Sequence, residues 1–96
     1  MVTIGMNYHV LPGKEEVFEA ACDRVVQTMQ GVEGHDESHL YRRIGDGGGV
    51  YLIVSRWASE EAFGAFIASD AFKKVTNWGR DNILAGRPRH TTYREG

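Results

Sequence analysis

The stretch VYLIVSRWASEEAFGAFI, residues 50–67, decides how the rest of the chain can fold. Its first five residues are all apolar, which is typical of a strand that is buried on both faces and is therefore central in its sheet. Ser59 follows as the expected N-cap of a helix, and Glu60 and Glu61 stand where the positive end of the helix dipole favours carboxylates. The stretch predicts a central strand over residues 50–57 and then a helix. The inner face of that helix carries four apolar residues: Ala62, Phe63, Phe66 and Ile67.

The chain before this stretch predicts a strand, a helix and a second strand. Over residues 2–10, large apolar side chains alternate with small or polar ones, which is the period of a strand. Over residues 15–29, apolar side chains recur every three or four positions, which indicates an amphipathic helix that Gly31 and Gly34 end. Residues 38–44 indicate a strand with one wetter face, and a glycine-rich turn at 46–49 joins it to the central strand.

The chain after this stretch predicts a further helical piece and a last strand. Ser69 and Asp70 are expected to cap the helical piece, and Gly86 and Pro88 to end it. Its apolar residues are Phe72, Val75 and Trp78. Residues 89–94 are expected to form the last strand.

The resulting order β-α-β-β-α-β predicts a ferredoxin-like α+β fold with an antiparallel sheet whose first and third strands are central. The helices of such a fold cover only one face of the sheet. A third strand that is apolar on both faces needs a cover on the other face, and a second copy of the sheet is the simplest one. We therefore predict a symmetric homodimer.

Length and composition fit one small domain over residues 1–96. With 42% hydrophobic and 25% charged residues the chain is typical of a soluble globular protein. A net charge of -2 with scattered basic residues argues against nucleic acid as a partner, and no run approaches the roughly 20 apolar residues of a membrane span. The single Cys22 and the lack of a signal peptide lead us to expect a cytoplasmic protein.

The run YLIVSRWASEEAFGAFIASDAFKKV, residues 51–75, resembles the signature of the antibiotic biosynthesis monooxygenase (ABM) superfamily. The shared pattern is an apolar strand, a Trp, Ser-Glu-Glu-Ala-Phe, a helix and then Ser-x-x-Phe. The order of elements resembles the family over essentially the whole chain, including Gly31-x-x-Gly34. The resemblance implies a dimeric α/β barrel with a pocket between sheet and helices in each subunit.

Two branches of the superfamily matter for activity. One oxidises aromatic polyketides to quinones without metal or flavin. Trp57 matches the strand-end Trp of that branch, but Ile53 stands where its Asn would be and Phe63 replaces a Tyr.

The other branch degrades haem, and its pattern is a first-strand Asn, a Trp in the second helix and a haem-ligating His a few turns later. Asn7 matches the Asn, but Phe66 occupies the Trp position and Thr76 stands where the His should be. Thr cannot replace an imidazole on iron, so the family route to axial ligation is closed.

The first strand supplies the candidate site. We expect its large residues to fill the barrel between subunits and its small or polar residues, Thr3, Gly5, Asn7 and His9, to face the helices under a roof of Phe63 and Phe66. Asn7 could then hold a substrate oxygen, or it could be a structural residue that bonds to a helix end. Trp57 could stack on a flat substrate or fill the core.

The remaining histidines and Cys22 leave further alternatives. His9 and His90 could act as bases or be exposed and inert, whereas His35 is expected to be solvated. His39 and Tyr41 share a strand face and could line the pocket or the dimer seam. No two His have a ligand spacing on a helix, so we expect no metal site, and Cys22 is expected to fill the core.

Three functions remain open at this point. The working hypothesis is a cofactor-independent monooxygenase that oxidises a small aromatic or quinol-type substrate with O2. Asn7 and Trp57 would be catalytic, and the substrate would contact His9, Tyr41, Phe63 and Phe66. The alternatives are a protein that binds or degrades haem, in which haem would be the cofactor, and a non-catalytic dimeric binding protein.

Overall fold

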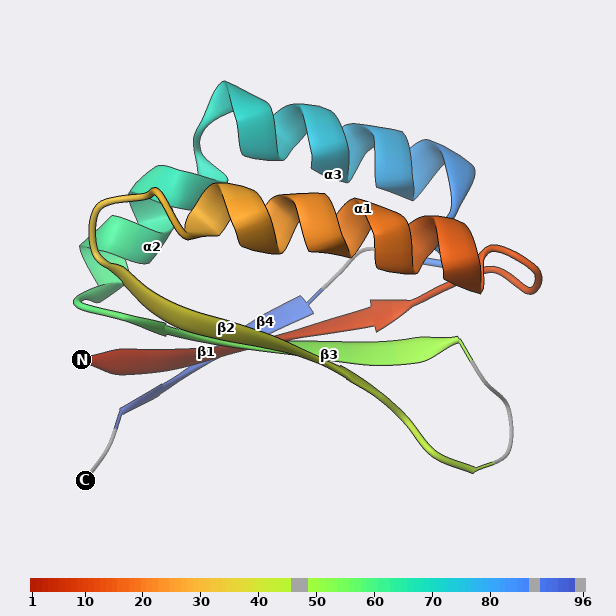
Figure 1. Ribbon diagram of the computed structural model, residues 1–96, viewed down its shortest axis with the longest axis horizontal. Helices are drawn as coiled ribbons and strands as arrows, with labels where there is room; N and C mark the ends of the chain where they lie inside the picture. Colours follow the sequence, from red (N-terminus) through yellow and green to blue (C-terminus); the bar gives the residue numbers. More distant parts are fainter. Residues whose placement is uncertain (46–48, 87–88, 95–96) are drawn as a thin grey trace.

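Three helices form one layer on one face of a four-stranded sheet (Figure 1). The computed structural model describes residues 1–45, 49–86 and 89–94, so most of the predicted 46–49 turn and Pro88 lie outside the described residues. The elements are β1 (Val2–His9), α1 (Glu15–Met29), β2 (His35–Arg42), β3 (Val50–Trp57), α2 (Glu60–Ile67), α3 (Asp70–Asn82) and β4 (Arg89–Arg94). This arrangement confirms the ferredoxin-like α+β fold.

The sheet is antiparallel with the strand order β2-β3-β1-β4, so β3 and β1 are central as predicted. The bounds of α1, β3 and β4 also match the prediction, but β2 begins three residues earlier, at His35. The cause is Gly34, whose φ of 90° turns the chain into the sheet and whose carbonyl accepts the Ala58 N–H at 2.7 Å.

A serine caps the start of each of the helices α2 and α3. The Ser59 hydroxyl accepts the Ala62 N–H at 3.1 Å, and the Ser69 hydroxyl accepts the Phe72 N–H at 3.3 Å. Each bond satisfies a backbone donor that the first turn of a helix leaves without a partner. Both predicted caps are therefore confirmed, and the helical region consists of two helices rather than one.

The core lies between the helix layer and the helix-facing side of β3. Tyr51, Ile53, Ser55 and Trp57 point to this side and are buried. The Phe18 ring of α1 lies 4.7 Å from the Tyr51 ring, measured between centroids. Trp57 has no exposed surface and lies 5.6 Å from Phe63 and 5.4 Å from Phe66 of α2. These aromatic contacts fix both ends of the helix layer onto β3.

The predicted orientation of β1 is wrong. Its large residues Val2, Ile4 and Met6 are buried under the helices, because the register places them beside Trp57, Ser55 and Ile53 of β3. The set that alternates with them is Thr3, Gly5, Asn7 and His9, and it lies on the opposite side of the sheet. Period-2 alternation shows which residues share a face but does not show which face the helices cover.

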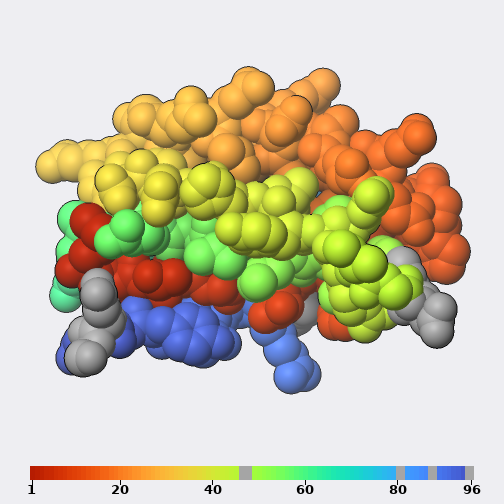
Figure 2. Space-filling view, turned by 60° about the horizontal axis from the view of Figure 1, so that its bottom comes forward, coloured from red at the N-terminus to blue at the C-terminus, as the bar shows by residue number. Residues whose placement is uncertain are grey.

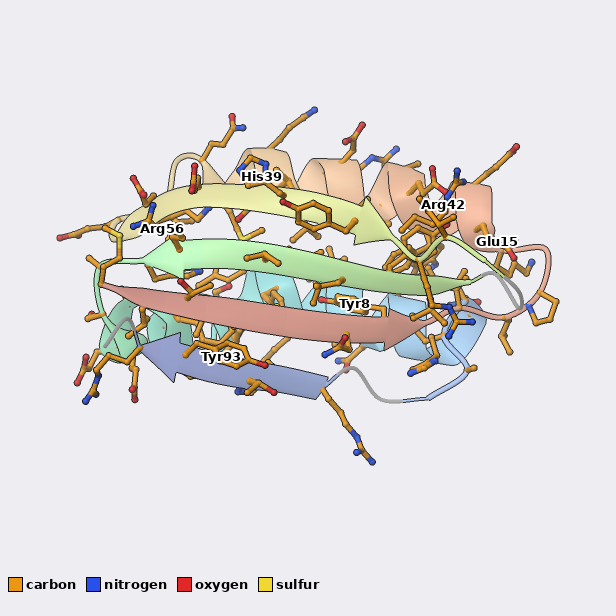
Figure 3. The ribbon with its side chains drawn as sticks, turned by 90° about the horizontal axis from the view of Figure 1, so that it is seen from below. Tyr8, Glu15, His39, Arg42, Arg56 and Tyr93 are labelled. Carbon is orange, nitrogen blue, oxygen red and sulfur yellow. The ribbon has the colours of Figure 1, made fainter. Side chains whose placement is uncertain are left out.

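The other side of the sheet, which we call the open face, carries no helix among the described residues (Figure 2). His39 of β2, Arg56 of β3 and Tyr93 of β4 come from three of its strands (Figure 3). A Cβ on Gly5 would lie 3.5 Å from the Tyr93 ring and 3.6 Å from Leu52, so these two side chains close over the glycine. The open face thus mixes apolar and polar groups, and no other described element of the chain covers it.

No helix in the described ranges is long and apolar enough to cross a membrane.

Gly34 and Gly79 predict opposite effects of the same substitution. Gly34→Ala would force a positive φ on alanine and place its Cβ 2.5 Å from the Ala62 Cβ, so we expect a loss of about 2 kcal/mol or more. Gly79→Ala adds only ordinary contacts at 3.8 Å inside α3 and should raise stability by about 0.5–1 kcal/mol. Urea unfolding of both variants measures the two effects, and equal changes would contradict this view of Gly34.

Candidate functional site

An apolar cavity lies under the helix layer and contains about 50 Å³ of free volume. We call it the inner cavity. Its floor comes from Tyr8 of β1 and Ile53 of β3, and its sides come from α1 and α3. The side residues include Phe18, Cys22, Val25, Phe72, Thr76 and Gly79. It occupies the region between sheet and helices where the resemblance implies a pocket.

A larger depression of about 600 Å³ runs along the outside of the seam between α1 and α3, and we call it the outer groove. The residues that line it are Glu16, Val17, Ala20, Ala21, Arg24, Lys74, Val75 and Trp78. Ala21, Val75 and Trp78 also line the inner cavity, so the two spaces share a wall.

The amino-acid sequence explains why this seam is hollow. Ala20 and Ala21 present methyl groups where α1 faces α3, and the longer side chains of Val75 and Trp78 only partly fill the space opposite. A third hollow of about 70 Å³ continues the seam toward α2 and is lined in part by Val25 and Phe66. The α1–α3 seam is therefore the loosely packed part of the helix layer.

Tyr8 and Thr76 bring hydroxyl groups to the lining of the inner cavity, and Cys22 brings a thiol. The Tyr8 hydroxyl donates to the Met6 sulfur at 3.7 Å, a weak acceptor, and burial raises the pKa of Tyr8 above its ordinary value. Burial also raises the pKa of the Cys22 thiol to about 12, and the charges of Asp23 and Glu19 add to the shift. Tyr8 and Cys22 are both protonated at neutral pH, so they can donate hydrogen bonds but cannot serve as bases.

The structure does not bring the predicted catalytic pair together. Trp57 is enclosed in the core and lines none of the three hollows, and Phe63 shares that position. Phe66 reaches only the third hollow. Asn7 and His9 are exposed on the open face, so the sheet separates them from this aromatic cluster.

The other predicted polar residues are also spread over several places. His39 and Tyr41 lie on the open face, with ring centroids 6.4 Å apart, and therefore do not line the inner cavity. His90 lies on the helix-facing side of the edge strand β4, 5.5 Å from the Phe63 ring.

His35 is half-buried rather than fully solvated, which corrects the prediction. Its ring meets the edge of Trp57 at a centroid distance of 5.0 Å, and its Nε2 lies 2.7 Å from the Ser38 hydroxyl. Burial is the main cause that lowers its pKa. His35 is thus part of the packing where β2 begins.

Sequence reasoning missed Tyr8 and Thr76 as cavity residues. Tyr8 belongs to the large alternating set of β1, and that set was assigned to the wrong side of the sheet. The apolar stripe of α1 could have shown which side is correct, because Phe18, Cys22 and Val25 need large apolar partners on the strand beneath them. Nowhere in the described ranges do three or more possible metal-ligating side chains gather.

Relatives with similar sequences are found among haloarchaea. A protein of Natronomonas pharaonis named "Putative heme-binding protein" is 39% identical over 88 residues, which are 92% of this chain and 14% of that protein. A protein of Halobacterium salinarum with the same kind of name is 35% identical over 88 residues, or 18% of its length. The chain thus spans less than a fifth of the length of these relatives.

Solved structures with the same fold come from bacteria and archaea. A conserved protein from Methanosarcina mazei superposes with a TM-score of 0.87 at 19% identity, over 99% of this chain and 92% of the other. SnoaB from Streptomyces nogalater, described as a cofactor-independent oxygenase, gives a TM-score of 0.82 at 20% identity, over 99% and 92% of the two chains. At these identities the likeness concerns the fold alone.

The sequence pattern of a known family covers most of the chain. The family description is "Antibiotic biosynthesis monooxygenase", and its pattern matches residues 1–78. This range includes β1, β3 and most of the hollow seam between α1 and α3. The sheet, the helix layer and this match agree: the chain belongs to the antibiotic biosynthesis monooxygenase family.

Proposed function

We propose that this chain is a cofactor-independent monooxygenase that oxidises a small phenol- or quinol-type aromatic in the inner cavity. The observation that carries the proposal is an apolar cavity between sheet and helices in which a sulfur is the one hydrogen-bond partner of the Tyr8 hydroxyl among the residues that the structure describes. Such a cavity suits a flat ring, and a hydroxyl donor in its floor suits an oxygen atom on that ring.

The reaction needs no group beyond substrate and O2. An ionised phenol transfers an electron to O2, and the two radicals combine at a ring carbon that carries hydrogen. The resulting hydroperoxide loses water and leaves a quinone. One oxygen atom of O2 enters the ring and the other leaves in water, so the ring is oxidised by the oxygen that it reduces.

Tyr8 would act as the hydrogen-bond donor in this reaction. A neutral phenol group can donate to the substrate oxygen or to the reduced oxygen while negative charge develops there, and the apolar walls strengthen that bond. Tyr8 and Cys22 are both protonated at neutral pH, so neither would remove the substrate proton. The substrate therefore has to bind as a phenolate or to ionise through bulk water.

The inner cavity has to enlarge before it accepts a ring. A cavity of about 150 Å³ is needed to hold benzene, and the inner cavity offers about 50 Å³. Val75 and Trp78 form part of its wall and are also exposed toward the outer groove. We propose that these two side chains move outward when substrate binds.

Oxygen consumption with a panel of simple phenols and quinols tests the proposed function. Tyr8→Phe keeps the ring but removes the donor, so we expect the rate to fall about tenfold or more. Ala21→Val fills the shared wall and should also lower the rate, whereas Ala65→Val on exposed α2 is the matched control and should not. The rate should rise with pH up to the pKa of the substrate phenol. Full activity in Tyr8→Phe would contradict the proposal.

We further propose that the open face packs against the same face of a second copy. Leu52 and Val54 point to this side of the central strand β3 and have no helix over them. An apolar central strand needs a cover on both faces, and a self-complementary sheet face provides one.

Light scattering tests the dimer. Wild type should have twice the mass of a single chain at micromolar concentration. Val54→Glu should shift the mass to that of the monomer, because two carboxylates would be buried at the seam. Val17→Glu places the same change on the exposed side of α1 and should leave the dimer intact. A wild-type monomer would overturn this part of the proposal.

Haem binding is the second candidate function, because it is the property named for the haloarchaeal relatives. The residues that line the inner cavity do not fit axial ligation of haem iron. Thr76 lines the cavity where the resemblance would place the ligating His, and no His lines the inner cavity or the outer groove. Tyr8 and Cys22 keep their protons at neutral pH.

A haemin titration followed by the Soret band separates the two candidates. Under the proposed function we expect a weak response that does not saturate at one haem per chain. A sharp band that saturates at one haem per chain would favour the second candidate. His9→Ala, His39→Ala and His90→Ala would then identify which imidazole binds the iron.

A further inference from the structure

We infer that the outer groove binds planar aromatic anions, with the anionic group between Arg24 and Lys74 and the ring against Trp78, and that it passes them into the inner cavity. The binding part of this inference stands on the groove itself, and the delivery part rests on the proposed function. It narrows the substrate class from phenol- and quinol-type aromatics in general to those that carry a further anionic group, such as a carboxylate.

The groove has one cationic end. Arg24 of α1 and Lys74 of α3 both line it. Neither side chain forms an ion pair within the described ranges, although several other arginines do: Arg42, Arg56 and Arg94 each lie within 4.0 Å of a carboxylate. Two cations that line one groove from facing helices, and that form no ion pair with any side chain the structure describes, are available to an anion from outside.

The middle of the groove is an apolar surface suited to a flat ring. Trp78 is 46% exposed, Val75 is 38% exposed and Val17 is 43% exposed, so a continuous apolar patch faces solvent here. Ala20 and Ala21 form the opposite floor and are too small to block it. An exposed indole beside small side chains lets a ring stack without displacing protein atoms.

Charge makes the groove directional. Glu16 lies at the other end and precedes Arg24 by eight residues on α1, or about 12 Å along the helix axis. An anion next to Glu16 is repelled, and an anion between Arg24 and Lys74 is attracted. The α1 and α3 helices run in opposite directions (Figure 1), which brings Lys74 to the Arg24 end and Trp78 toward the Glu16 end. A ligand with one anionic end therefore binds in one orientation.

The ring then lies directly above the inner cavity. Ala21, Val75 and Trp78 form the wall between the two spaces, so outward movement of the two larger side chains joins them. An anionic group held at Arg24 and Lys74 would keep one end of the ligand in water while the ring passes under the helices. This arrangement avoids burial of the charge, which would be costly.

Calorimetric titration with 2-naphthoate and with its neutral isostere 2-naphthamide tests the inference. We expect naphthoate to bind about tenfold more tightly at low salt, with the difference shrinking as salt is added. Arg24→Gln and Lys74→Gln should each weaken naphthoate binding by about threefold and leave naphthamide unchanged. Trp78→Ala should weaken both ligands by about tenfold. Lys73→Gln on the same helix is the matched control, because Lys73 lines none of the three hollows.

Equal binding of the two ligands, no binding of either, or an equal effect of Lys73→Gln and Lys74→Gln would each overturn the inference. The proposed function can fail separately. Naphthoate binding with the expected variant pattern but without oxygen uptake from any phenol would remove the catalytic proposal and keep the groove. Oxygen uptake that is unaffected by Arg24→Gln and Lys74→Gln would remove the delivery role of the outer groove and keep the catalytic proposal.

Discussion

The fold depends on the packing of Trp57 at the end of the central strand β3. Its ring contacts Phe63 and Phe66 of α2 and the edge of His35 at the start of β2, and it has no exposed surface. One side chain thus joins the sheet, the second helix and the turn after the first helix. Because the Trp57 ring packs one face of β3 against the helices, the alternating residues Leu52 and Val54 lie on the open face.

The packing of one face of β3 against the helices has two consequences for function. The helix-facing side of the sheet is filled tightly around Trp57 but loosely toward α3, where small residues of α1 leave the inner cavity and the outer groove. The other side of the sheet has no helix over it among the described residues. Under our two proposals, ligand binding and self-association would use opposite sides of one sheet and would not compete for surface.

Much of the fold follows from local sequence signals. Apolar patterns and glycines predicted the bounds of α1, β3 and β4, and serine caps predicted the starts of α2 and α3, since each signal acts on its own neighbours. The start of β2 was missed because Gly34 acts through a bond to Ala58, which is distant in sequence. The orientation of β1 in the sheet was missed for a similar reason. The alternation of large and small side chains is the same whichever side the helices cover, and only the register with β3 shows which set of side chains contacts the helices.

The candidate site was harder to predict than the fold. The position matches that drew attention to Asn7 and Trp57 are matches in sequence, and the sheet places the two residues on opposite sides. Tyr8 carries no family signal, yet it lines the cavity because it is the residue next to Asn7 that faces inward. A shift of one position along a strand moves a side chain from one side of the sheet to the other.

The central claim is that small ligands reach this protein from the helix side, through the seam between α1 and α3. Amide and indole chemical-shift mapping during a titration with 2-naphthoate tests this claim directly. We predict that the largest changes fall on the Trp78 indole N–H and on the amides of Ala21 and Val75. Changes that concentrate on Leu52, Val54 and Tyr93 of the open face would contradict the account.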